Sequence, residues 1–140
     1  MSGGVRNERG TVTLFVLGVC VGCLFLAGCA LDLWRAVAVR RELSAMADAA
    51  ATAAANGLDT ASLRTGTVRL SPVPARMLAT EVLLEHGRVQ SLDRAAIVVA
   101  GSSVRVVLED HVDFSLLRIF LGDDRFVIRV AAVAVAREVP

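Results

Sequence analysis

One uncharged stretch near the N-terminus constrains this chain more than any other feature. The 22 residues from Gly10 to Leu31 carry no charge and are almost all apolar or small. As a helix rising about 1.5 Å per residue, they would extend roughly 33 Å, close to the ~30 Å hydrocarbon core of a bilayer. A chain of 140 residues has too little other material to bury such a helix on every side. The stretch therefore predicts a membrane-spanning helix over residues 11–31.

The charges that flank this stretch leave its orientation open. Arg6 and Arg9 lie in the short polar flank of residues 1–10, as expected for a cytoplasmic end. Three further arginines, however, follow the span at positions 35, 40 and 41. Counting positive charges therefore does not decide which side of a membrane each end occupies.

Two motifs inside the stretch each have two interpretations. Gly18 and Gly22 have the spacing that lets two helix backbones approach closely, although small residues are common in membrane spans in any case. The run from Leu26 to Cys29 fits the lipobox of bacterial lipoproteins, with Cys29 as the acylated residue. Lipoproteins usually continue into a flexible polar tether, whereas here the helical pattern continues beyond Asp32. Acylation at Cys29 is therefore kept as the alternative.

Residues 32–57 predict an alanine-rich extension of the same helix. This segment is strongly helix-forming and ends at Asn56-Gly57, residues that a helix C-terminus prefers. A narrow apolar stripe follows the helical repeat through Val39, Leu43 and Met46. Such a stripe permits close packing, either against the chain's own domain or against neighbouring subunits. The interaction residues proposed here are Ala47, Asp48, Ala50, Ala51 and Ala54.

Residues 58–140 predict one small α+β domain built on an antiparallel sheet with two short helices. The pattern indicates a short strand at 67–70, a helix at 75–86 and a strand at 94–100. Gly101-Ser102 is typical of a two-residue hairpin turn. Beyond it we expect a half-buried strand at 104–112, a short helix at 114–121 and a long apolar strand at 126–136. The last run is so continuously apolar that it suggests a strand with neighbours on both sides.

Few residues suggest chemistry. Glu109, His111 and Asp113 share one face of the predicted strand, and with Asp123 and Asp124 they offer ligands for a hard cation. The simpler interpretation is a solvated sheet face, and we predict no metal site. No phosphate loop or nucleophile motif is present, and no Cys or His pair outside the apolar stretch has zinc-ligand spacing, so we predict no catalytic residue, no cofactor and no small-molecule substrate. A net charge of +1 gives no footprint for nucleic acid.

The first 57 residues resemble the N-terminal module of the Tad (tight adherence) pilus-assembly proteins, the TadE/TadG-like family. The resemblance lies in Glu8-Arg-Gly-Thr-Val-Thr13, the apolar span, Asp32, then Arg40-Arg-Glu-Leu43 and the alanine run from Ala47 to Ala55. It implies a single-pass protein of the bacterial cell membrane with a cytoplasmic N-terminus and an extracytoplasmic domain. It also implies other Tad proteins as partners, through the membrane-spanning and alanine-rich helix.

One position departs from the pattern of TadE-like pseudopilins. In these proteins a prepilin peptidase cuts after the glycine, here between Gly10 and Thr11, and a glutamate is fifth in the mature chain. Phe15 occupies that position here, which favours the TadG-like members that stay anchored. Asp32 is expected to contact a partner or to pair locally with Arg35. The resulting expectation is a non-enzymatic accessory or minor pseudopilin-like component of a tight-adherence pilus or related secretion system.

Overall fold

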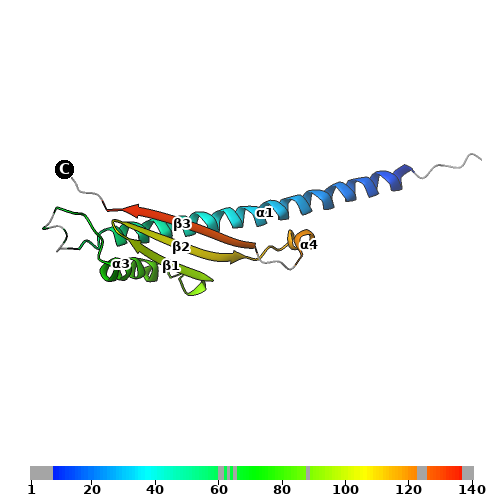
Figure 1. Ribbon diagram of the computed structural model, residues 1–140. Coiled ribbons are helices and arrows are strands. Elements are labelled where there is room, and N and C mark those ends of the chain that lie inside the picture. The colour runs from blue at the N-terminus through cyan, green and yellow to red at the C-terminus, as the bar shows by residue number, and fades with distance from the viewer. Residues whose placement is uncertain are drawn as a thin grey trace, which may run out of the picture.

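One long helix organises the fold (Figure 1). The computed structural model describes residues 8–59, 62, 64, 66–87, 89–122 and 126–136. Helix α1 (Glu8–Ala55) projects at its N-terminal half, and the other elements lie along its C-terminal half. In chain order these elements are α3 (Pro72–Glu85), the 3-10 turn η1 (Val89–Ser91), β1 (Arg94–Ala100), β2 (Ser103–Val112), α4 (Arg118–Leu121) and β3 (Phe126–Val135). The predicted α+β class, with a long N-terminal helix and an antiparallel sheet, is confirmed.

Helix α1 has two halves with different surroundings. Its most apolar window is long enough to cross a membrane, and none of that window is buried against the rest of the chain. The first side chain along the helix to be fully buried is that of Asp32, and from Leu43 to Ala54 a continuous stripe is buried. One helix therefore leaves its apolar surface uncovered in the first half and supplies a wall of the domain core in the second.

The sheet has β2 in the centre, with β1 and β3 antiparallel on either side. Gly101 and Ser102 join β1 to β2 as predicted. The positive φ of Gly101 (61°), without one at Ser102, matches the type II′ hairpin that places glycine first. Along β2 the even-numbered residues from Val104 to Val112 are buried and face α1, as the alternation indicated.

Strand β3 corrects one expectation. The apolar run at its position suggested a strand with two neighbours, but among the described residues β3 pairs with β2 alone and is an edge strand. Ile128 and Ala132 point inward and are buried, whereas Val133 and Val135 on the other face are exposed. The run is apolar on both faces because one face packs on α1 and the other face also carries valines, not because the strand is enclosed.

Three other element boundaries differ from those expected. Helix α3 starts at Pro72, since a proline at the first helical position lacks an N–H that would have no partner there. The expected strand at 67–70 is reduced to a single bridge between Leu58 and Leu70. The expected helix at 114–121 is regular only over α4, because the preceding backbone N–H groups bond elsewhere.

The core lies between the alanine-rich half of α1, helix α3 and the inner face of the sheet. Small residues allow α1 and α3 to approach closely, with Ala75 and Ala79 of α3 fully buried. Gly57, just beyond the end of α1, lies close to the first turn of α3: a Cβ atom there would lie 2.6 Å from the backbone nitrogen of Ala75. The contact is with backbone, so only glycine fits where the chain leaves α1.

Candidate functional site

The described residue with the most distinctive environment is Asp32, one residue beyond the uncharged stretch. Its side chain is buried, with only 2% of the residue exposed. Its Oδ2 atom accepts hydrogen bonds from three consecutive backbone N–H groups, those of Ser115 (3.0 Å), Leu116 (2.7 Å) and Leu117 (3.1 Å). The carboxylate therefore joins α1 to a segment more than eighty residues away along the chain.

The segment before α4 provides these donors because of where it lies in the chain. Residues 115–117 precede Arg118, the first residue of α4, so the carbonyl groups of that helix do not serve as partners for their N–H groups. A carboxylate at this end is favoured both by the free N–H groups and by their aligned dipoles. Asp32 thus caps the turn that leads into α4, in place of a local side chain.

A second contact lies one turn earlier on α1. A Cβ atom on Gly28 would lie 1.8 Å from Cδ1 of Leu116, so the leucine side chain rests on the bare backbone of the helix. Asp32 and Gly28 are four residues apart and lie on the same face of α1. Together they form what we call the junction: Gly28 and Asp32 of α1 with the turn at residues 115–117.

Hydrogen bonding also favours the ionised form of the Asp32 carboxyl. The pKa of the Asp32 carboxyl is held below its ordinary value, chiefly by the N–H of Leu117. The N–H groups of Leu116 and Ser115 and the positive charge of Arg35 act in the same direction, whereas burial acts against them. Arg35 therefore contributes electrostatically, but the direct partners of Asp32 are backbone groups of its own chain.

The other interaction residues expected from the sequence fall into two environments. Gly18 and Gly22 are open, and a Cβ atom on either would meet nothing within 4 Å. The four alanines lie in the core of the domain: Ala47, Ala50, Ala51 and Ala54 are at most 2% exposed. Of the two interpretations left open for the alanine stripe, the structure supports packing against the chain's own domain. Asp48 lies on the opposite, exposed side of α1.

The processing and lipidation positions lie within α1. Gly10 and Thr11 are exposed in its first turns, and Cys29 is half-buried beside the junction. Helix α1 continues without interruption past Cys29 to Ala55. The flexible tether that usually follows an acylated cysteine is therefore absent from the described part of this region.

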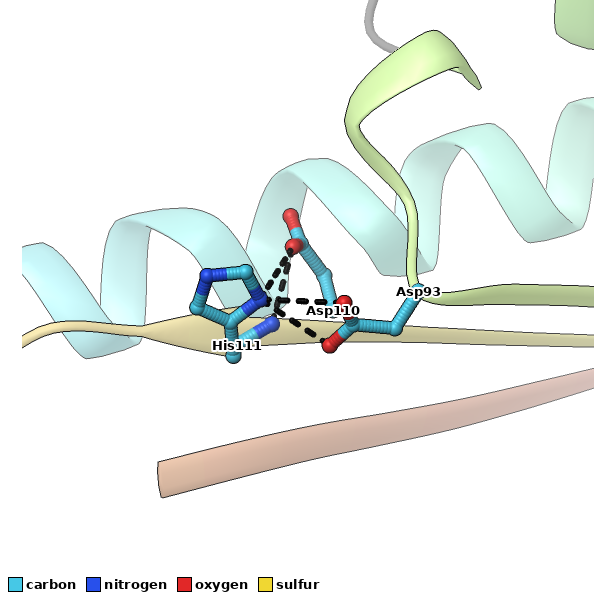
Figure 2. Close-up of side chains that lie close together, drawn as sticks. All are labelled: Asp93, Asp110 and His111. Atoms are coloured by element: carbon cyan, nitrogen blue, oxygen red, sulfur yellow. Dashed lines mark hydrogen bonds and ion pairs between the residues drawn. The ribbon is translucent and has the colours of Figure 1, made fainter. Parts of the chain in front are cut away.

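A polar cluster lies at the end of β2 and ties it to the loop before β1 (Figure 2). The Nδ1 atom of His111 lies 3.0 and 3.1 Å from the two carboxylate oxygens of Asp93. The His111 backbone N–H donates to Oδ1 of Asp110 at 2.8 Å. Three potential metal-ligand atoms, one from each residue, lie within 4.8 Å of one another. Ordinary hydrogen bonds account for this arrangement, which fixes the start of β1 against β2.

The residues considered for a cation from the sequence are not those that meet here. Glu109 pairs with Arg129 across the β2–β3 ladder, and Asp113 is exposed beyond the end of β2. Asp123 and Asp124 lie outside the described residues. Strand alternation correctly put Glu109 and His111 on one face, but it had no means of finding Asp93, which a different loop brings in.

A comparison with known protein families matches the region of α1, the helix that carries Gly28 and Asp32 of the junction. The model of the family described as putative Flp pilus-assembly TadE/G-like proteins matches residues 10–57, about a third of the chain. This confirms the resemblance to the Tad family noted from the sequence: residues 10–57 are a TadE/G-like segment. No curated protein and no solved structure gave a match.

Asp32 generates a prediction about pH. Because its pKa is lowered on folding, its stabilising effect is complete above the ordinary carboxyl value of about 3.9 and is lost as the pH falls through the folded value. We expect Asp32→Asn to unfold more easily than the parent at pH 7. That difference should shrink as the pH falls below about 3.9, because the carboxyl of the unfolded parent then takes up a proton that the folded state binds less readily.

The measurement is urea unfolding of the full chain in a mild detergent, followed by pulse proteolysis at pH 7, 5, 4 and 3. Asp48→Asn is the matched control, since it removes an exposed carboxylate from the same helix. The control should follow the parent at every pH. A difference between Asp32→Asn and the parent that stays constant down to pH 3 would contradict the account.

Proposed function

We propose that this chain is a non-enzymatic, membrane-anchored accessory component, minor and pseudopilin-like, of a tight-adherence (Flp-type) pilus assembly or related secretion system. The main support for the proposal is that the family match and helix α1 have nearly the same boundaries. The matched residues 10–57 cover almost all of α1, and no residue in the most apolar window of that helix is buried against the rest of the chain. A family segment with an uncovered apolar surface is suited to a bilayer and to other helices.

The proposed partner contacts involve surfaces that the chain leaves open. Gly18 and Gly22 present a smooth helix face, where another membrane helix can approach closely. Beyond the span, α1 carries Arg40, Arg41 and Asp48, whose side chains are exposed, with Arg40 close to the start of β3. The alanine face is occupied by the chain's own core, so partners would meet α1 through its glycine face or through these charged residues.

The proposed topology has the N-terminus in the cytoplasm and the sheet domain outside the membrane. In that arrangement the domain lies at the end of the span, held there by the junction rather than by a flexible tether. The uninterrupted helix supports this proposal over acylation at Cys29, because acylation would require the chain to be cut within α1. The role is mechanical, with residues 11–31 as the anchor.

The proposed anchor predicts where the mature protein begins. We expect the intact mass of protein extracted from its own bacterial membranes to correspond to a chain that starts at Met1 or Ser2. A mass that starts at Thr11 would mean processing by the peptidase, and the protein would then be a mature pseudopilin. A lipid-modified chain that starts at Cys29 would contradict the proposed anchor.

The face of α1 that carries Gly18 and Gly22 provides a prediction that tests the role in pilus assembly. In cells lacking the native gene, the Gly18→Leu/Gly22→Leu double variant should insert into the membrane but restore fewer surface pili than the parent chain. The reason is that leucine side chains would hold a partner helix away from the backbone. Electron microscopy gives the pilus count, and carbonate extraction gives the amount inserted.

The matched control is Val16→Leu/Cys20→Leu, which enlarges side chains at the same spacing on roughly the opposite face of the helix. It should restore pili to the parent level. Normal pilus numbers with both double variants would rule out the glycine face as the contact. Normal pilus numbers in cells lacking the gene altogether would contradict the proposed function.

A further inference from the structure

The segment that Asp32 holds is strongly apolar. Residues 114–121 read Phe-Ser-Leu-Leu-Arg-Ile-Phe-Leu, with six large apolar side chains, one cation and no acid. We propose that this segment, with α4 at its end, is a second membrane contact that lies in the outer interface of the bilayer beside α1. The proposal rests on the membrane anchoring of α1 proposed above.

The junction fixes the level of the segment relative to the span. Asp32 follows Leu31, the last residue of the uncharged stretch, and it binds the backbone of residues 115–117 directly. The side chain of Leu116 reaches further and packs on Gly28, about 4.5 Å of helix rise inside the end of that stretch. If residues 11–31 occupy the hydrocarbon core, Leu116 lies at its edge.

Helix α4 lies on the side of the junction that faces the projecting half of α1. Figure 1 shows α4 beyond the end of the sheet, alongside α1 in the direction of the N-terminus. Ile119 in α4 is 70% exposed, so its side chain is available to contact lipid. Nothing in the described part of the domain covers it.

Other elements also expose large apolar side chains near the level of the junction. Leu33 and Trp34 directly follow Asp32 on α1 and are exposed, with Trp34 on roughly the opposite side of the helix from Asp32. Phe126 at the start of β3 is also exposed. Tryptophan is enriched where the hydrocarbon meets the headgroups. Arg118 is exposed beside Ile119, and an arginine at this depth can bury its stem while its guanidinium lies among phosphates.

Lipid suits this surface better than a protein partner, because the surface is continuous with the uncovered apolar stretch of α1. A protein would have to cover α4 and the outer turns of the span together, whereas a bilayer around residues 11–31 reaches α4 without further contacts. Of the described acids close to the segment, Asp32 is buried at the junction, and Asp113, which directly precedes the segment, is exposed. Two points of contact would hold the domain at a fixed height and orientation over the membrane.

The test measures the depth of single tryptophans in vesicles. Trp34 is the only tryptophan, so Trp34→Phe gives a silent background. On that background, three full-length variants carry Ile119→Trp, Leu24→Trp or Met77→Trp. Leu24 lies within the span, while Met77 on α3 is 67% exposed and lies at the far end of the domain from α4. Each variant is reconstituted into phosphatidylcholine and phosphatidylglycerol vesicles with or without lipids brominated along the acyl chains.

The expected result is that brominated lipid quenches the Leu24→Trp and Ile119→Trp variants and leaves Met77→Trp unchanged. The emission of Ile119→Trp should also shift to shorter wavelength when the protein passes from detergent-free denaturant into vesicles. Because Ile119 is exposed, its replacement does not disturb the core. Protease resistance of the domain checks this.

Two results would overturn the proposal, and they are distinguishable. Quenching of Leu24→Trp without quenching of Ile119→Trp would leave α1 as an anchor and remove the second contact. A blue-shifted but unquenched Ile119→Trp would likewise overturn it, since this would mean that protein and not lipid covers α4. The absence of quenching at both positions would contradict the anchoring itself.

Discussion

The structure depends on the contact between the Asp32 carboxylate and three backbone N–H groups of the segment before α4. Burying a carboxylate costs free energy unless hydrogen bonds or an opposite charge stabilise it. Here three backbone N–H groups donate hydrogen bonds to one of its oxygens. In return, those donors gain a partner that lies outside their own segment. Each side of the junction would be unfavourable alone, and together they fix the segment before α4 at one height on a 48-residue helix.

That helix performs two tasks that place opposite demands on its surface. The first half needs uncovered apolar side chains, and Leu14, Leu17 and Leu24 are indeed exposed. The second half needs small residues, because α3 and the sheet must approach its backbone closely. Alanines and the terminal Gly57 meet that need, and they contribute little apolar area per turn, so the core relies on the inward valines and leucines of β2 for bulk. The change from one half to the other occurs at Asp32.

Local patterns made much of the fold predictable. The uncharged run and the alanine-rich run predicted α1, the alternation of β2 predicted its buried face, and Gly101-Ser102 predicted the hairpin. Each of these signals depends on residues close together in the chain. The enclosed β3 was wrong because an apolar run does not reveal whether its outer face is covered.

The junction was less predictable, and the reason is physical. The sequence singled out Asp32 but suggested Arg35 or another subunit as its partner, whereas the partner is backbone more than eighty residues away. Backbone donors leave no trace in the amino-acid sequence. Gly28 resembled other small residues of the span, and only the position of Leu116 reveals its purpose. The cluster of Asp93, Asp110 and His111 likewise depends on a loop that no periodicity describes.

Hydrogen exchange at the amides of Ser115, Leu116 and Leu117 tests the central claim most directly. The measurement uses the unmodified full chain in lipid nanodiscs, read by mass spectrometry with fragmentation to single residues. The account predicts that these three amides exchange much more slowly than those of the exposed hairpin turn at Gly101, although the region before α4 has no regular secondary structure. Exchange as fast as in that turn would mean that Asp32 does not hold the segment, and the account would be wrong at its foundation.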